Sequence, residues 1–514
     1  MTLSRELSNQ SSLQTRLALF FTILGIYMLF SPAHFLTTPD EELNLRTTLS
    51  LVQGYKGAIP PLPGGFASAQ GIDGNEYAQY GLGLPLAYAA WTRLGIWIDP
   101  SADTSPNHLE NITPLTQAGT PFLRAWITIF SMLITTGSAV IFHWILSAMN
   151  FPYRRALFFS LLFALGTYAF PHGRTLFSEP LVALCLLASI ACLLRSRRFP
   201  ADPKWLFYAG LLWAYAVLTR LDTLVTLPAA AWFVLMDGQD QKLRLRINPV
   251  EIALFSIPFV AAFITIGLYN QYRFDSFFST GYEDQAEKIH FITPLLVGLH
   301  GFLFTPGRSI FMYSPPLIFT FFGIPCLWRR SRWLCGGLLI LCGLFLAVMS
   351  KWQNWSGGYD WGPRHIYQLT PFFMLFAVFF FDQKPAFNTY AKTAGWIFLA
   401  LLSFLIQFLG LAADPVQAIR GLLYAWNNTA IAPGFSFWQV LMQFMVYLPQ
   451  FSGPVLHWRE ILNHGPDLLC VRLAQAAPGL LLIYLPPILM AGFGGWKLYR
   501  IFRNRGVGAE GHFA

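Results

Sequence analysis

Long apolar segments recur along this chain of 514 residues, and they restrict its fold more than any other feature. Most approach the roughly 20 apolar residues that a helix needs to cross a bilayer. Only 11% of the residues are charged, against about 25% in soluble domains. We therefore expect an all-α polytopic membrane protein with about 12 transmembrane helices. The twelve segments lie near 17–36, 122–146, 156–171, 176–194, 205–219, 224–236, 250–269, 309–327, 333–350, 366–381, 393–412 and 478–498.

The positive charges between these segments predict the orientation of the chain. An N-terminus in the cytoplasm, with alternating spans, places 20 of the 34 Lys and Arg residues inside but only 7 of the 25 Asp and Glu residues. Lys and Arg concentrate in the cytoplasmic loops of membrane proteins. Both termini are therefore expected in the cytoplasm. The net charge of +9 follows from this sidedness and indicates no nucleic-acid partner.

Two long loops then fall on the outer side, 37–121 and 413–477. We divide the chain at residue 412, with a transmembrane catalytic module in 1–412. Residues 413–514 are expected to hold an outer loop with an interfacial helix, the last span and a cytoplasmic tail. The apolar segments 292–304 and 435–448 are interpreted as interfacial or re-entrant helices, because a span at 435–448 would place the C-terminal arginines outside.

Unusual polar residues gather in the loops of the outer side. A single arginine near a helix end often snorkels toward water, but several such loops on one face indicate a functional surface, since ionisable residues at membrane ends are candidates for function. The loops read HGR (172–174), TRLDT (219–223), STGYEDQ (279–285), TPGRS (305–309) and KWQNWSGGYDWGPRH (351–365).

The stretch HFLTTPDEELN, 34–44, is typical of a helix start. Thr38 suits the N-cap, Pro39 the first helical position, and Glu41 the third, which together make a capping box. The cap needs no contribution from Asp40. The helix that follows is expected to be amphipathic and to lie on the outer membrane surface, with one apolar face made by Leu45, Leu49 and Val52.

Asp40 is the carboxylate that helix capping leaves unexplained. It stands where the first span ends, at the depth where a lipid-borne substrate would be met. The N-terminus of a helix favours the ionised form of a carboxylate. An ionised carboxylate acts as a general base toward a hydroxyl. The hypothesis is that Asp40 is catalytic, with Glu41 as a second candidate.

The order of these features resembles the GT-C superfamily of membrane glycosyltransferases. A span ends in an acidic pair, an amphipathic helix follows, and NEYAQYGLGLPL, 75–86, comes next. The likeness is to the family 39-like enzymes, which include protein O-mannosyltransferases and lipid A aminoarabinose transferases. TLFSEPL (175–181), LFTPGRSIFMYSPP (303–316) and GGYDWGPRH (357–365) also resemble stretches of such proteins. The resemblance covers about two thirds of the chain, and 413–514 carries no recognised motif.

The resemblance implies an inverting membrane glycosyltransferase with a polyprenyl-phosphate-linked sugar donor. Asp40 would be the base, with Glu41 beside it. The acceptor would be a hydroxyl on a lipid, glycan or protein at the outer face of a bacterial inner membrane. Gln79 stands where relatives have a lysine that helps to hold the donor phosphate, which puts a donor contact from this loop in doubt.

The donor phosphate requires cations that neutralise its developing charge. The candidates are Arg174, Arg308 and Arg364, with His172, Arg220 and Tyr359 behind them. Arg220 is also expected to form a structural ion pair with Asp222. The predicted substrate-binding residues are Tyr77, Gln79, Tyr80, Glu283 and Asp360, the last of which partly resembles the Trp-Asp motif of oligosaccharyltransferases.

No cofactor is required by these patterns, and a divalent metal held by Asp40, Glu41 and Glu283 or Asp284 stays open. The six cysteines show no spacing typical of a metal site,. The alternative function is a transporter, flippase or polymerase of a lipid-linked surface glycan. A transporter is expected to show internal repeats and charged residues within its spans, and this sequence shows no repeat and few such charges.

Overall fold

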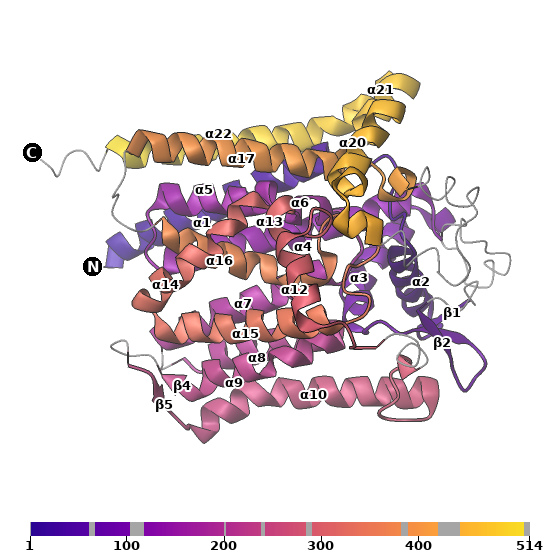
Figure 1. The fold of residues 1–514 in the computed structure, drawn as a ribbon, viewed down its shortest axis with the longest axis horizontal. Helices are drawn as coiled ribbons and strands as arrows, with labels where there is room; N and C mark the ends of the chain where they lie inside the picture. Colours follow the sequence, from indigo (N-terminus) through magenta and orange to yellow (C-terminus); the bar gives the residue numbers. More distant parts are fainter. Residues whose placement is uncertain are drawn as a thin grey trace, which may run out of the picture.

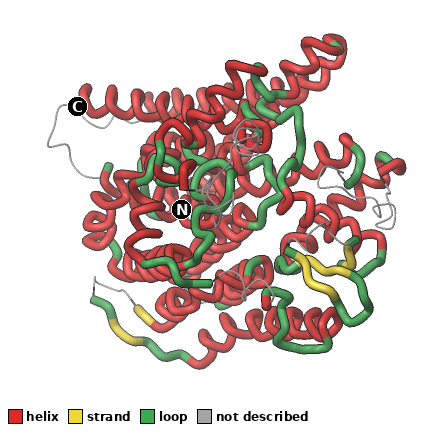
Figure 2. The backbone as a smooth tube through the Cα atoms, turned by 45° about the vertical axis from the view of Figure 1, so that its right-hand side comes forward, coloured by secondary structure: helices red, strands yellow, loops and turns green. Residues whose placement is uncertain are grey.

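The computed structural model of the chain describes residues 2–60, 67–102, 118–199, 202–237, 242–283, 290–381, 389–419 and 443–507. Helices dominate, and strands form only two small patches at the periphery (Figure 2). The first half contains α1 (Thr2–Leu29), α2 (Pro39–Gln53), β1 (Ala58–Ile59), β2 (Ser68–Gln70), β3 (Glu76–Ala78), α3 (Gly83–Ile98), α4 (Pro121–Ala148), α5 (Tyr153–Gly166), α6 (Ala169–His172), α7 (Glu179–Arg198), α8 (Lys204–Thr219), η4 (Leu221–Thr226) and α9 (Leu227–Leu235). The second half contains β4 (Met236–Asp237), β5 (Arg244–Leu245), α10 (Pro249–Phe274), α12 (Leu295–Phe304), α13 (Ile310–Tyr313), η6 (Pro315–Phe319), α14 (Thr320–Arg330), α15 (Arg332–Lys351), η7 (Arg364–Leu369), α16 (Thr370–Phe380), α17 (Thr389–Ala412), α20 (Gly453–His464), α21 (Leu469–Ala476), η9 (Pro478–Tyr484) and α22 (Leu485–Val507).

The predicted all-α membrane architecture is confirmed. By length and composition, six stretches of helix among the described residues can cross a membrane, and the number of spans, expected to be twelve, stays a prediction. The six are Pro121–Ala148, Glu179–Arg198, Pro249–Phe274, Arg332–Lys351, Ala394–Ala412 and Pro478–Arg503.

The segment expected as one span at 309–327 is broken into α13, η6 and α14. The break falls at Ser314, Pro315 and Pro316, where two residues lack an amide hydrogen and cannot continue an α-helix,. The Ser314 hydroxyl instead accepts a hydrogen bond from the Tyr168 amide at 3.0 Å. Periodicity and length indicated an apolar segment here, but the two prolines decided its path.

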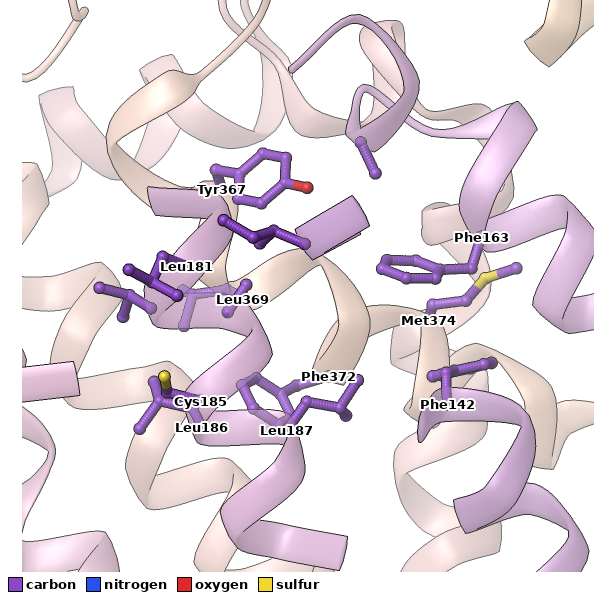
Figure 3. Packing of buried hydrophobic residues seen from close by; sticks show 14 of the residues in the cluster. Phe142, Phe163, Leu181, Cys185, Leu186, Leu187, Tyr367, Leu369, Phe372 and Met374 are labelled. Carbon is purple, nitrogen blue, oxygen red and sulfur yellow. The ribbon is translucent and has the colours of Figure 1, made fainter. Parts of the chain in front are cut away.

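The core is centred on α16, whose residues from Thr370 to Phe379 are all buried. A helix that is apolar on every side is typical of the interior of a large protein. Phe372 and Met374 lie among side chains of α7, α4 and α5, including Leu187, Phe142 and Phe163 (Figure 3). At about 1.5 Å per residue, the 11 residues of α16 form a helix shorter than the core of a bilayer. The segment that runs through this region therefore combines α16 with η7, which directly precedes it.

The elements are sorted between the two ends of the helix bundle (Figure 1). The start of α1, the end of α22 and the β4–β5 ribbon lie at one end. The opposite end carries α2, α3 and the antiparallel sheet of order β1–β3–β2. Elements of the predicted first outer loop thus lie at the end opposite the β4–β5 ribbon, and the sidedness of the loops stays a prediction.

Residues after 412 pack against the first helices of the chain. α22 runs along α1, where the Gly25 backbone meets that of Ala491. Pro32 forms a β-bridge with Leu468, and the Leu469 amide donates to the Ser31 carbonyl at 3.0 Å. The division at residue 412 stays a prediction. Of the segment predicted at 435–448, residues 435–442 lie outside the described residues, and 443–447 are helical.

Candidate active site

Asp40 lies in the first turn of α2, where the local sequence starts the helix as predicted. The Thr38 hydroxyl accepts a hydrogen bond from the Glu41 amide at 3.4 Å, and the Glu41 carboxylate accepts one from the Thr38 amide at 3.1 Å. The other Glu41 oxygen accepts from the Leu176 amide, also at 3.1 Å. Burial raises the pKa of Glu41, against the hydrogen bonds from Thr38 and Leu176 that lower it. Both Glu41 oxygens are therefore engaged in holding the backbone.

The helix itself is more deeply enclosed than expected. Nine of the 15 residues of α2 are buried, and Leu45 and Leu49 belong to the main hydrophobic core. A helix on the membrane surface would bury one face only. The expectation of a surface helix is corrected, since α2 is surrounded by protein and packs on α3. This enclosure fixes the position of Asp40.

The Asp40 carboxylate meets two donors from distant parts of the chain. The Tyr80 hydroxyl, just after β3, donates to Asp40 Oδ1. Arg364, at the start of η7, places Nη2 2.6 Å from Asp40 Oδ2. The Asp40 side chain is 17% exposed, so it is held firmly and still accessible.

Arg364 connects three carboxylates. Besides Asp40, its Nη1 lies 2.7 Å from Asp360 Oδ2, and its Nε lies 3.8 Å from Glu179 Oε1. The guanidinium also lies over the Phe177 ring, 4.5 Å from the centroid, in a cation–π contact. Burial lowers the pKa of Arg364, but Asp360, Asp40 and Glu179 outweigh it and raise the pKa well above the ordinary value. Arg364 therefore stays charged.

Asp360 is the carboxylate of this cluster whose protonation is most perturbed. It is 8% exposed. Burial raises the pKa of Asp360 to about 7; Arg364 opposes this effect, and the nearby charges of Asp40 and Glu41 add to it. Near neutral pH, Asp360 therefore exists in both protonation states, and its hold on Arg364 depends on pH.

A second group of ion pairs adjoins the first. Arg220 Nη2 lies 2.6 Å from Asp222 Oδ2, which confirms the predicted pair, and Nη1 lies 2.7 Å from Glu179 Oε1. Glu179, at the start of α7, thus joins Arg220 to Arg364. Sequence reasoning missed Glu179, although its motif, TLFSEPL, had been noted. Sequence reasoning also missed Tyr282. Burial raises the pKa of Tyr282 to about 12; the charge of Arg220 opposes this rise, and the charge of Asp222 adds to it.

Arg308 holds backbone rather than an acid. Its Nη1 donates to the Asp360 carbonyl at 2.7 Å and to the Gly362 carbonyl at 3.2 Å, and its Nη2 donates to the Gly358 carbonyl. Gly358 and Gly362 have φ of +73° and +72°, a region that glycine enters without a side-chain clash. Arg308 is 1% exposed. In this structure it fixes the loop that carries Asp360.

The remaining donor-phosphate candidates are spread around this loop. Arg174 donates to the carbonyls of Phe30 and Gly410, each at 3.1 Å, and burial lowers its pKa to about 10. His172 Nε2 lies 2.7 Å from the Trp361 carbonyl, and burial lowers its pKa to about 4. His172 is therefore neutral at pH 7. Tyr359 is half-buried against the cluster of Ile419, Met445 and Leu456.

Of the predicted substrate-binding residues, the structure places Tyr80 and Asp360 beside Asp40 and Arg364. Tyr77 is fully buried in β3, and its hydroxyl donates to Asp73 Oδ2 at 2.7 Å. Gln79 Nε2 donates to the Ser68 carbonyl at 3.5 Å. Glu283 is exposed and accepts from the Thr280 and Gly281 amides at 2.8 and 2.7 Å. Tyr77, Gln79 and Glu283 thus serve local structure here.

Across the described ranges, no three His, Cys, Asp or Glu side chains come together in a group that could hold a metal ion. Asp284 lies outside those ranges. The divalent-metal alternative from the sequence therefore stays a prediction.

The sequence matches no protein-family model and no curated protein. Solved structures do resemble the chain. The oligosaccharyltransferase of Archaeoglobus fulgidus in the apo form, a GT-C membrane glycosyltransferase, is 12% identical, with a TM-score of 0.50 over 88% of this chain and 64% of that protein.

The chain has the GT-C fold. It spans less than two thirds of the length of that oligosaccharyltransferase. ArnT from Cupriavidus metallidurans bound to undecaprenyl phosphate is also similar, at 14% identity and a TM-score of 0.43, over 95% of this chain and 75% of ArnT. In the GT-C fold of this chain, the cluster of Asp40, Arg364, Asp360 and Glu179 lies where the starts of α2, α7 and η7 converge.

Proposed function

We propose that this protein transfers a sugar from a polyprenyl-phosphate-linked donor to a hydroxyl acceptor at the outer face of the membrane. The contact that carries the proposal is the one between Asp40 and Arg364. It places a carboxylate that helix capping does not use beside a buried cation. The GT-C fold is consistent with such a transfer.

Asp40 acts as the general base. The acceptor hydroxyl attacks the anomeric carbon, a new carbon–oxygen bond forms, and the bond from that carbon to the phosphate oxygen breaks. The acceptor proton passes to Asp40, and the electron pair of the broken bond stays on the lipid phosphate. A single displacement of this kind inverts the anomeric centre. The Tyr80 hydroxyl orients the base through its hydrogen bond to Oδ1.

Arg364 holds the leaving phosphate. A charged guanidinium binds phosphate oxygens with charge-assisted hydrogen bonds, and it stabilises charge that develops as the bond breaks. Arg364 also contacts Asp40 directly. Binding of the donor phosphate would draw the Arg364 guanidinium toward the phosphate, and Asp40 would then be freer to accept the proton.

The other arginines support this arrangement. Arg220 keeps Glu179 in place, and Arg308 holds the loop of Asp360. We revise the role of Arg308 from donor clamp to positioning residue, because its guanidinium donates its hydrogen bonds to backbone carbonyls. Arg174 faces a neighbouring cavity.

Asp40→Asn is the decisive experiment. The substitution keeps the shape of the side chain and removes the base, so sugar transfer should fall by at least about 100-fold, the low end of what a general base contributes. The assay measures labelled sugar transferred from undecaprenyl-phosphate-linked donors by the purified protein in nanodiscs.

Asp275→Asn serves as the matched control, because Asp275 is an exposed carboxylate at the end of α10. It should retain full transfer. An Asp40→Asn protein that folds normally and transfers sugar at the wild-type rate would exclude Asp40 as the base.

A further inference from the structure

A cavity of about 60 Å³ opens beside the cluster, shares Asp360 with it and is also lined by Glu41. Its other walls include the segment before α2 and the residues after α17. Asp414 and Asp467, from the second outer loop, also line it. This volume accommodates a few water molecules, or the polar groups along one edge of a larger ligand.

The walls of this cavity are firmly built. The Asp467 amide donates to the Ala412 carbonyl at 2.7 Å, and Asp467 Oδ1 lies 2.6 Å from His34 Nδ1. Asp414 Oδ1 accepts from the Val416 amide at 2.8 Å. Asp414 and Asp467 are each 6% exposed. Two carboxylates are thus buried at the edge of the cavity, and Asp467 pairs with the half-exposed His34.

Two buried histidines and Asp467 line this cavity with polar atoms that make no hydrogen bond to the described residues. His172 is 2% exposed, and with Nε2 donating to the Trp361 carbonyl, its Nδ1 is left as a free acceptor. His457 is equally buried, and Nδ1 donates to the Leu409 carbonyl at 3.1 Å, which leaves Nε2 as an acceptor. The second carboxylate oxygen of Asp467 is likewise without a hydrogen bond there.

The part of the lining that the structure describes is therefore rich in acceptors and poor in donors. Burial lowers the pKa of both His172 and His457 to about 4, each partly offset by its backbone hydrogen bond, so both rings are neutral. Among the described residues, the cavity is lined by four carboxylates and one arginine, Arg174. Buried polar groups need hydrogen-bond partners. A ligand that provides hydrogen-bond partners for these polar groups must donate hydrogen bonds and carry no negative charge.

We infer that this cavity recognises the hydroxyl or amino groups along one edge of an uncharged or cationic sugar, and that it rejects sugars bearing a carboxylate. The inference rests on the proposed function, since it assigns a specificity site beside the same catalytic cluster. The sugar belongs either to the lipid-linked donor or to a glycan acceptor. Phosphate is excluded, so the cavity is distinct from the place where Arg364 holds the leaving group.

The test compares undecaprenyl-phosphate-linked hexose, hexosamine and hexuronic acid as donors, using the full chain in nanodiscs. Wild-type protein should favour the hexose or hexosamine over the uronic acid by about 10- to 100-fold in kcat/KM, as expected for one charged hydrogen bond made or lost. Asp414→Asn and Asp467→Asn should reduce that preference about tenfold or more. Both substitutions keep an oxygen for the contacts of the native side chain.

Glu460→Gln is the matched control, because Glu460 lies on α20 near His457 and pairs with His464 outside the cavity lining. It should keep the wild-type preference. A change in the KM of the donor assigns the cavity to the donor sugar, and a change in the KM of the acceptor assigns it to the acceptor.

A binding measurement separates this inference from the proposed function. Methyl glycosides of a hexosamine and a hexuronic acid are titrated into the protein by calorimetry. Binding of the hexosamine alone, lost in Asp414→Asn, supports the cavity even if no lipid donor is turned over. Equal binding of both glycosides, or of neither, overturns it, as does a sugar preference that Asp414→Asn and Asp467→Asn leave intact.

Discussion

Removing Arg364 should damage the proposed catalytic cluster more than any other single arginine substitution. Its guanidinium lies within 2.7 Å of both Asp40 and Asp360, and its side chain is 11% exposed. Arg364→Ala leaves these carboxylates and Glu179 close together without their cation. Breaking a buried ion pair by deleting one partner costs about 3–5 kcal/mol, so the variant should be markedly less stable to heat.

The catalytic loss is expected to be separate from that instability. Removing one preorganised group that stabilises developing charge costs about 2.7–4 kcal/mol, which corresponds to a loss of about 10²- to 10³-fold in kcat/KM. The assay is sugar transfer by protein that elutes as a single species in gel filtration. Arg364→Lys keeps the charge but cannot span both carboxylates, so its activity should lie between wild type and Arg364→Ala.

Arg93→Ala is the control, because Arg93 is exposed on α3. It should lose neither stability nor activity. If folded Arg364→Ala showed wild-type kcat/KM and donor KM, the assignment of this residue to the leaving phosphate would be refuted. A double-mutant cycle with Asp360→Asn would then report only structural coupling.

Three further outcomes are expected. Tyr80→Phe should lower kcat about tenfold with little change in donor KM, because it frees Asp40 from an orienting hydrogen bond,; equal losses in both parameters would count against that role. Arg308→Lys should lower the Tm by a few degrees and slow transfer in proportion, since lysine lacks the planar fork whose two nitrogens reach the three carbonyls that Arg308 holds,; a variant as stable as wild type would contradict this. Raising the pH through about 7 ionises Asp360 and tightens its hold on Arg364, so donor KM should rise with pH, and Asp360→Asn should flatten that profile.

Local sequence was sufficient for the features that depend on neighbouring residues. The capping box of Thr38 and Glu41 was predicted from four adjacent positions, because a helix cap is made by side chains three residues apart,. The Arg220–Asp222 ion pair was also predicted, because its two residues lie only two positions apart along the chain. The apolar periodicity likewise indicated a polytopic membrane protein, although the prolines at 315 and 316 broke a segment that hydropathy alone treats as continuous.

The contacts of the proposed catalytic cluster were not predictable in this way. The sequence singled out Asp40, Arg364 and Asp360 separately but not their contact, because Asp40 and Arg364 are more than 300 positions apart. Glu179 carried only a weak signal, a Ser-Glu-Pro at a helix start. Arg308 was expected to be a phosphate ligand, yet the fold turns its donors onto carbonyls, and no pattern of spacing shows where a long side chain will end.

By itself, the sequence determined the membrane-spanning architecture and the start of α2, since hydrophobic burial and helix capping act over short distances along the chain. Only the tertiary structure decided that Asp40 is held by Tyr80 and Arg364, and that the second outer loop lines a cavity with Asp414 and Asp467. The physical reason is that burial and charge pairing depend on which distant segments meet, and that is set by the packing of the helices.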